Sequence, residues 1–173
     1  MNSSQRTSDT GPTGSAYDAA VRMLGLREHS RFELADKLSR KGFPEDESRE
    51  ALNRLVEQRY VDDARYAEMV MRHHGTLGRA GLVQQMRRRG IAPAIYGPLV
   101  DGVGREEELE RALAAASRRS TPVPAGRVER EKWRRRTSSF LMRRGFAQPV
   151  VIAVLSQLSE QAGVGGGDWV ESP

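Results

Sequence analysis

One six-residue phrase occurs three times in the chain, as Leu38-Ser39-Arg40-Lys41-Gly42-Phe43, Met86-Arg87-Arg88-Arg89-Gly90-Ile91 and Leu141-Met142-Arg143-Arg144-Gly145-Phe146. The glycines of successive copies are 48 and 55 residues apart. A period of this length is typical of helical repeat arrays, in which each unit buries its apolar face only against its neighbours. The phrase therefore predicts one structural unit used three times, and it directs the search for function to a surface rather than a pocket.

Each copy of the phrase is predicted to form the turn between two amphipathic helices. Glycine tolerates the positive φ with which many helices end, and the apolar residue after it can fold back on the helix just completed. Apolar residues recur ten and thirteen positions after each glycine, at the spacing of one helix face. They are Leu52 and Leu55, Val100 and Val103, and Leu155 and Leu158. Pro44, Pro93 and Pro149 follow the glycines, where a new helix can begin.

A further helix is predicted ahead of each pair, so each unit holds about three helices. Ser30 and Glu33 have the spacing of a capping box at the start of the helix that ends in the first phrase. Strand alternation is nearly absent. The fold class is therefore all-α, with three tandem three-helix repeats built as helix-turn-helix-like units. The predicted segments are a disordered tail at 1–15, repeats at 16–62, 63–104 and 105–160 with an internal loop at 120–126, and a disordered tail at 161–173.

Several classes of function are disfavoured by what the sequence lacks. There is no cysteine, which removes disulfides, thiol catalysis and cysteine-ligated metals. There is neither a run of about 18 apolar residues nor a signal peptide, so the expectation is a cytoplasmic protein with no membrane partner. A monomer is also expected. His29, His73 and His74 lack metal-ligand spacing, and Asp62-Asp63 is interpreted as a helix cap. No catalytic constellation, metal or cofactor is expected, and the chain is predicted not to be an enzyme.

Positive charge increases along the chain. Residues 16–61 carry nine basic and nine acidic side chains, residues 62–105 carry seven and four, and residues 106–160 carry eleven and seven. The densest block runs from Arg127 to Arg144, with eight basic residues against Glu129 and Glu131. Such a block indicates a polyanion or an acidic protein groove as the partner.

Two interpretations of the basic residues remain open. On a helix, Lys132, Arg136 and Arg143 form a stripe opposite an apolar face, suited to bidentate contacts with phosphates or carboxylates. Basic residues in a last helical turn also stabilise the helix dipole by about 0.3–1 kcal/mol each, which accounts equally well for the pairs inside the phrases. The candidate binding residues are Arg87, Arg88, Arg89, Lys132, Arg134, Arg135, Arg136, Arg143 and Arg144, with Arg40 and Lys41 as weaker candidates.

The residues around these phrases resemble the RecX family. The most specific element is the run Tyr60-Val61-Asp62-Asp63-Ala64-Arg65-Tyr66-Ala67, and the resemblance covers about residues 16–160. It implies an elongated, curved array of the three repeats. Arg59 departs from the family, which usually has glycine before the tyrosine. The basic surface is then expected to face a protein filament and its DNA.

The resemblance also implies a function. RecX proteins bind the RecA recombinase filament and inhibit its ATPase, strand exchange and coprotease activities, so the chain is expected to regulate recombination, DNA repair and the SOS response. The expected partners are the RecA filament and the single-stranded DNA that it holds, bound without sequence preference. An alternative is a DNA-binding helix-turn-helix protein without RecA specificity, and a third possibility is an inert helical scaffold.

Overall fold

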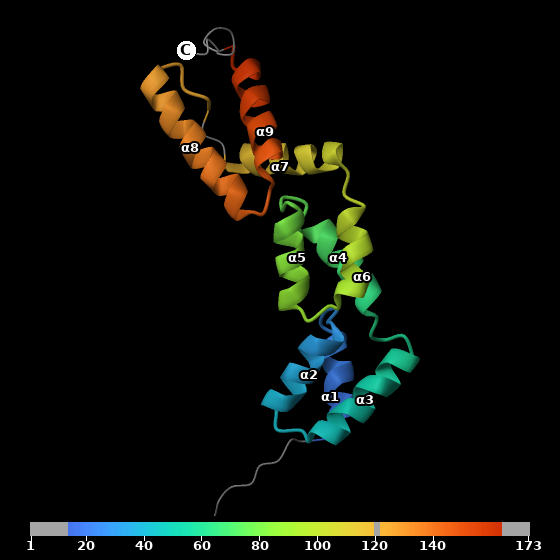
Figure 1. Cartoon of the computed structure of the whole chain (residues 1–173). Coiled ribbons are helices and arrows are strands. Elements are labelled where there is room, and N and C mark those ends of the chain that lie inside the picture. Colours follow the sequence, from blue (N-terminus) through green and yellow to red (C-terminus); the bar gives the residue numbers. More distant parts are fainter. Residues whose placement is uncertain (1–13, 120–121, 164–173) are drawn as a thin grey trace, which may run out of the picture.

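The protein is described by a computed structural model that covers residues 14–119 and 122–163. Within these residues it contains nine helices and no strand (Figure 1). The helices are α1 (Ala16–Leu24), α2 (Arg31–Arg40), α3 (Glu45–Glu57), α4 (Asp63–His73), α5 (Arg79–Arg88), α6 (Pro93–Asp101), α7 (Arg105–Arg119), α8 (Arg127–Arg143) and α9 (Gln148–Gln161). None of these helices is long and apolar enough to cross a membrane.

The helices form three triplets, each with its own apolar core. One cluster of buried residues comes from α1–α3, a second from α4–α6 and a third from α7–α9. The helices that pack most closely belong to the same triplet. Leu38, Met86 and Leu141, the first residues of the three phrases, are fully buried at equivalent places in the three cores. The predicted fold class, an all-α array of three-helix repeats, is confirmed, and we call the triplets repeats 1, 2 and 3.

The three phrases form the same turn between the second and third helix of each repeat. Gly42, Gly90 and Gly145 have φ values of 84°, 66° and 83°, so each ends its helix in the left-handed region as predicted. In repeat 1 the N–H of Phe43 donates to the carbonyl of Leu38 at 3.2 Å. Equivalent bonds close the other two turns.

The second helices of the three repeats follow one another along one side of the molecule (Figure 1). The turn after α8 meets the N-terminus of α5, and the turn after α5 meets the N-terminus of α2. We call this series α8, α5 and α2 the column. Its helices hold 17, 10 and 10 residues, which at 1.5 Å per residue amounts to about 55 Å. The column is longer than the roughly 30 Å diameter of a small domain.

Repeat 2 caps the N-terminus of α2. The hydroxyl of Ser30, the N-cap residue, donates to the carbonyl of Arg89 at 2.5 Å. The N–H of Arg31 donates to the carboxylate of Asp63 at 2.9 Å. Asp62, by contrast, caps its own helix α4, as predicted. The capping box predicted for Ser30 and Glu33 is also present.

Repeat 3 caps the N-terminus of α5 in the same way. The N–H groups of Gly78 and Ala80 donate to the carbonyls of Arg144 and Gly145 at 3.0 and 3.2 Å. A carboxylate again comes from the first helix of the next repeat, since the N–H of Arg79 donates to Glu108 at 3.3 Å. Ser30 and Gly78 both stand twelve residues before the turn glycine of their own repeat. The two junctions are therefore two copies of one docking arrangement.

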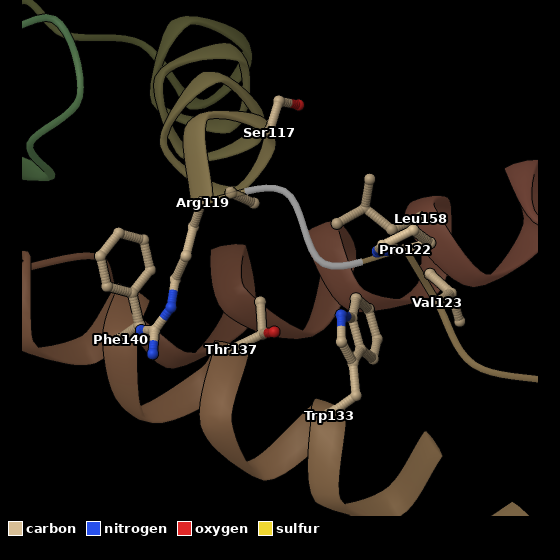
Figure 2. Close-up of a pocket in the computed structure, with 9 residues that line it drawn as sticks. Ser117, Arg119, Pro122, Val123, Trp133, Thr137, Phe140 and Leu158 are labelled. Carbon is tan, nitrogen blue, oxygen red and sulfur yellow. The ribbon is translucent and has the colours of Figure 1, made fainter. Parts of the chain in front are cut away.

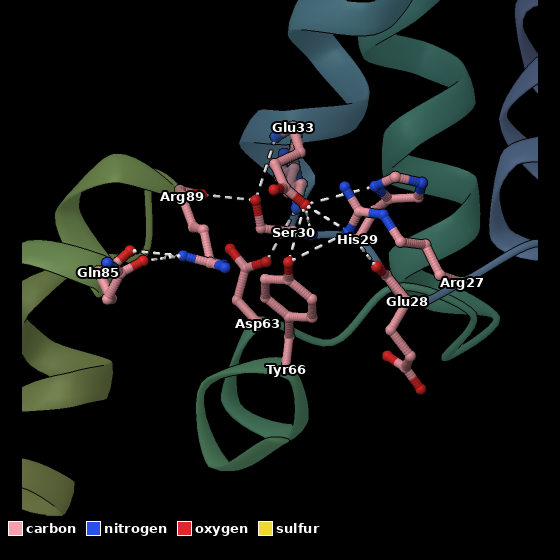
Figure 3. A network of polar contacts seen from close by, with 10 residues as sticks. Arg27, Glu28, His29, Ser30, Glu33, Asp63, Tyr66, Gln85 and Arg89 are labelled. Atoms are coloured by element: carbon pink, nitrogen blue, oxygen red, sulfur yellow. Dashed lines mark hydrogen bonds and ion pairs between the residues drawn. The ribbon is translucent and has the colours of Figure 1, made fainter. Parts of the chain in front are cut away.

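A polar cluster accompanies the first junction (Figure 3). The Glu33 carboxylate accepts hydrogen bonds from Tyr66 at 2.9 Å and Arg27 at 3.3 Å, and it lies 3.3 Å from Nδ1 of the buried His29. Burial alone would raise the pKa of Glu33, but the hydrogen bonds from Tyr66 and Arg27 lower it overall. Burial, assisted by Arg27 and Lys37, lowers the pKa of His29. The ring is therefore neutral near pH 7.

Three details refine the predicted segments. Ser15 was assigned to the first tail, but its side chain accepts a hydrogen bond from the N–H of Asp18 and caps α1. Helix α9 likewise continues to Gln161, one residue into the second predicted tail. The predictions for residues 1–13, 120–121 and 164–173 fall outside the described residues. Arg59 has φ 58°, so it adopts the left-handed conformation for which the RecX pattern uses glycine.

We expect Arg59→Gly to stabilise the protein. A residue with a Cβ pays about 1–2 kcal/mol in the left-handed region, whereas glycine loses about 0.5–1 kcal/mol more backbone entropy on folding. The net gain of about 0.5–1 kcal/mol should raise the Tm by about 1–4 °C in thermal unfolding followed by circular dichroism. Gly90→Ala, which introduces a Cβ at φ 66° and against Phe32, should lower it. A lower Tm for Arg59→Gly would contradict the strain at this turn.

Acidification from pH 7.5 to 5.5 should destabilise the fold through His29. Its pKa is below the ordinary 6.5 in the folded chain, so the unfolded chain takes up the proton first and stability falls as the pH falls through 6.5. Glu33 contributes only at lower pH, because its pKa is lowered from 4.5. Urea unfolding at the two pH values should show a smaller loss for His29→Gln. Some loss should remain, since burial, Arg89 and His73 also lower the pKa of His74.

Candidate functional site

The most basic surface of the structure lies on α8. Trp133, Thr137 and Leu141 are buried on one side of this helix, as the sequence pattern predicts. On the other side the side chains of four basic residues are exposed, and we call them the α8 basic face. They are Lys132, Arg135, Arg136 and Arg143.

Most of the α8 basic face is available to a ligand. Arg135 forms a surface ion pair with Glu131 at 3.2 Å, a kind of contact that contributes at most about 1 kcal/mol. The side chains of Lys132, Arg136 and Arg143 make no ion pair or hydrogen bond with any other described residue. Arg119 at the end of α7 joins the face, and together with Ser139 these arginines line a shallow depression of about 240 Å³. Guanidinium groups so arranged can bind phosphates or carboxylates bidentately.

Two other predicted arginines have architectural contacts. Arg144 donates to the carbonyl and hydroxyl of Thr76 at 3.2 and 2.7 Å, and its guanidinium lies 4.9 Å from the centre of the Phe140 ring. Arg89 donates to the side chain of Gln85 at 2.6 Å, while its carbonyl accepts from Ser30. Both residues thus belong to the junctions between repeats.

The remaining candidates are distributed along the column. Arg88 is exposed at the end of α5, and Arg87 is exposed but donates to the hydroxyl of Tyr96 at 3.2 Å. Arg40 forms a surface ion pair with Asp36 at 2.9 Å, and Lys41 is exposed at the end of α2. Arg134 is half-buried on α8. The structure therefore places the predicted residues on one series of helices but concentrates the exposed ones in repeat 3.

The described residues contain little that suggests chemistry. Within them no group of three or more His, Asp or Glu side chains is placed to hold a metal ion. Repeat 3 does contain a hollow of about 270 Å³ beneath the end of α7, lined largely by apolar side chains (Figure 2). The hollow is not among the features predicted from the sequence.

Sequence comparison assigns the chain to a family. Residues 16–55 match the family model described as "RecX, first three-helix domain". The chain is 35% identical over 143 residues to "Regulatory protein RecX" of Trichlorobacter lovleyi, which covers 78% of this chain and 90% of that protein. It is 34% identical over 157 residues to the protein of the same name from Halorhodospira halophila, covering 88% and 94%. The chain belongs to the RecX family.

Solved RecX structures share the fold. The crystal structure of RecX from Lactobacillus salivarius superposes with a TM-score of 0.68 at 20% identity, covering 84% of this chain and 95% of that one. A second crystal structure of a regulatory protein RecX gives the same TM-score at 23% identity. These likenesses establish the arrangement of the helices. The RecX relatives are named as regulatory proteins.

The neighbours Arg143 and Arg144 should respond differently to substitution. Arg144→Ala removes charged hydrogen bonds across a junction and should lower the free energy of unfolding by about 1.5–3 kcal/mol. Arg143→Ala changes an exposed side chain and should stay within about 0.5 kcal/mol of the parent. Urea unfolding of both variants measures the difference. Equal effects would contradict the division between junction and surface arginines.

Proposed function

We propose that this RecX-family chain inhibits the RecA recombinase by binding along the filament that RecA forms on single-stranded DNA. The observation that carries the proposal is the α8 basic face, where Lys132, Arg136 and Arg143 project from one helix without partners among the described residues. Like charges gathered in this way repel one another unless an anionic partner neutralises them. Family membership supplies the candidate partner.

The column gives this binding its length. Exposed basic side chains occur on α8, at the end of α5 and at the end of α2, along about 55 Å of helix. A ligand that contacts all three helices must itself be extended, as a filament groove is. Binding across several subunits would obstruct the groove or restrict the subunits, and inhibition then requires no chemistry from the chain. Affinity gained from phosphate contacts should weaken with salt, because counterions are released.

The helix-turn-helix alternative conflicts with the helices that follow the turns. Recognition helices read bases with residues near their N-termini, and here the helices after the glycine turns are α3, α6 and α9. The first turn of α3 holds the acidic residues Glu45, Asp46 and Glu47, which phosphates repel, and the first turns of α6 and α9 hold no basic residue. These N-termini are therefore poorly suited to a major groove, whereas binding to a phosphate backbone without sequence preference remains compatible with the fold.

The proposal is tested by the single-stranded-DNA-dependent ATPase of RecA at substoichiometric amounts of the chain. The intact chain should inhibit it. The triple variant Lys132→Gln, Arg136→Gln and Arg143→Gln should need at least about tenfold more protein, equivalent to about 0.5 kcal/mol per charge. The inhibition by this variant should also depend less steeply on salt. The slope of log affinity against log salt concentration should fall by about two units, because three phosphate contacts are lost.

A matched control removes three charges elsewhere. Arg22, Arg49 and Arg72 are exposed on α1, α3 and α4, and their replacement by glutamine should leave inhibition within about twofold of the parent. Absence of inhibition by the intact chain would refute the proposed function. Equal weakening by both triple variants would refute the surface and leave only an effect of net charge. Tight, sequence-dependent duplex binding would favour the helix-turn-helix alternative.

A further inference from the structure

Two adjoining hollows open beside the N-terminal half of α8, with volumes of about 270 and 340 Å³. They share Trp133 and Thr137 of α8, above which the end of α7 and the connection at Pro122 and Val123 pass (Figure 2). Leu158 of α9 closes the first hollow. The first volume lies just below the range of drug-sized sites and the second at its lower end, so each suits a single large side chain.

At one core position that lines the first hollow, repeat 3 departs from the other two repeats. Eight residues before the turn glycine, repeats 1 and 2 have Leu34 and Leu82, both fully buried. Repeat 3 has Thr137 at this position, with a smaller side chain and a hydroxyl group. Replacing a buried leucine by a smaller residue leaves unfilled volume unless the surroundings collapse. In repeat 3 the unfilled volume beside Thr137 is the first hollow, which a ligand can enter.

A second departure adjoins the first. Twelve residues before the turn glycine, Ser30 and Gly78 receive the following repeat, and Trp133 occupies the equivalent position in repeat 3. No further repeat docks there among the described residues. The position that holds the next repeat in the first two units therefore has a buried indole beside an open hollow in the third.

The lining specifies the chemistry of the occupant. The first hollow is surrounded mainly by apolar groups of Trp133, Phe140 and Leu158, whereas the second is bordered by Arg119, Lys132 and Arg136 with one carboxylate. A large apolar side chain flanked by carboxylates matches both. A nucleobase matches less well, because its several polar edge atoms would find few partners besides the hydroxyls of Ser117 and Thr137.

The chain carries such a segment. We propose that Asp168-Trp169-Val170-Glu171, near the end of the chain, docks on this site, with the Trp169 indole in the first hollow and its flanking carboxylates beside the cations of the second. Trp169 is the only other tryptophan of the chain, and residues 164–173 contain no basic residue. An indole needs one acceptor for its N–H, which the Thr137 hydroxyl can provide.

The link between the end of α9 and Trp169 is long enough for the indole to reach the first hollow. Helix α9 ends at Gln161, one turn after Leu158, and Gly163 turns the chain in the left-handed region at φ 67°. The six residues from Gly163 to Trp169 span up to about 20 Å when extended. Three of the five residues between them, Gly165–Gly167, have no side chain. Tethering by a short link gives an effective concentration in the millimolar range, so a weak contact is sufficient for occupancy.

Docking would place Asp168 and Glu171 against Lys132 and Arg136, two members of the α8 basic face. The segment then competes with a polyanion for these cations. This competition rests on the proposed function, whereas the docking itself does not. A segment docked in about four-fifths of the molecules lowers the apparent affinity for a polyanion about fivefold.

The docking is tested by fluorine NMR of the full chain labelled with 5-fluorotryptophan, with Trp169→Phe to assign the two signals. The reference is the free labelled peptide Gly-Gly-Asp-Trp-Val-Glu-Ser. In the intact chain the Trp169 signal should differ from the peptide signal, with less than half its shift between H2O and D2O. Thr137→Leu, which installs the residue of the other two repeats, should return the signal to the peptide value. The double variant Asp168→Asn and Glu171→Gln, which changes no residue of the three repeats, should move the Trp169 signal part of the way to the peptide value.

Two results would overturn the docking. One is a Trp169 signal that coincides with the peptide in the intact chain. The other is a displaced signal that neither Thr137→Leu nor the carboxylate variant moves, which would place the indole elsewhere. Displacement of the Trp169 signal by oligo(dT) at low salt supports competition for the site. A Trp133 signal that shifts with oligo(dT) equally in Trp169→Ala and parent would instead assign the hollow to nucleotides and refute the proposal.

The competition between the docked segment and a polyanion is measured in a separate experiment. Trp169→Ala and Thr137→Leu leave the net charge unchanged, and both should bind fluorescein-labelled oligo(dT) about fivefold more tightly than the parent in anisotropy titrations. Unchanged binding by both variants would refute the competition but leave the NMR result standing. Because neither measurement contains RecA, failure of the ATPase test would refute the proposed function without affecting the docking.

Discussion

The N-terminus of the second helix in repeats 1 and 2 is the point on which the array depends. The first N–H groups of a helix have no partner within it, and here the next repeat supplies a carboxylate to one N–H of α2 and one of α5. Its turn carbonyls accept from the Ser30 hydroxyl at α2 and from the N–H groups of Gly78 and Ala80 at α5. The carbonyl end of one helix thus meets the amino end of another, which aligns the dipoles of the column favourably. The repeats are joined through polar caps while each keeps its own apolar core. This division explains why the molecule is elongated.

The same constraint separates the arginines of the repeated phrase. The residue before each turn glycine of repeats 2 and 3 gives its carbonyl to the preceding repeat, so Arg89 and Arg144 are fixed at a junction and half-buried. Their neighbours Arg88 and Arg143 are one position away on the helix and point to solvent. Adjacent arginines of one phrase therefore differ in role: one holds a junction between repeats and the other is exposed to solvent. Composition alone does not distinguish them.

Periodicity was sufficient for the helices, the glycine turns and the buried face of α8, because these depend on residues close together in the chain. The junctions could not be predicted in this way. Asp63 and Glu108 cap helices that begin about thirty residues earlier, and no local pattern distinguishes them from carboxylates that serve their own helix. The hollow, by contrast, could be predicted from the alignment of the three phrases. Extending that alignment upstream pairs Thr137 with Leu34 and Leu82, which marks a missing core side chain.

The first turn of α8 carries more basic than acidic side chains, whereas the helix dipole favours the opposite. A helix N-terminus is stabilised by acidic residues in its first turn, and α2, α3, α4 and α7 have them without a basic excess there. Helix α8 begins with Arg127 and has Arg130 one turn later, with Glu129 between them. Among the three helices of the column, α8 is the one whose N-terminus no following repeat covers within the described residues, so this positive end of the column carries the further positive charge of Arg127 and Arg130. An anionic segment, whether it belongs to the proposed filament or is the segment proposed above to dock on α8, would offset both the helix dipole and this added charge.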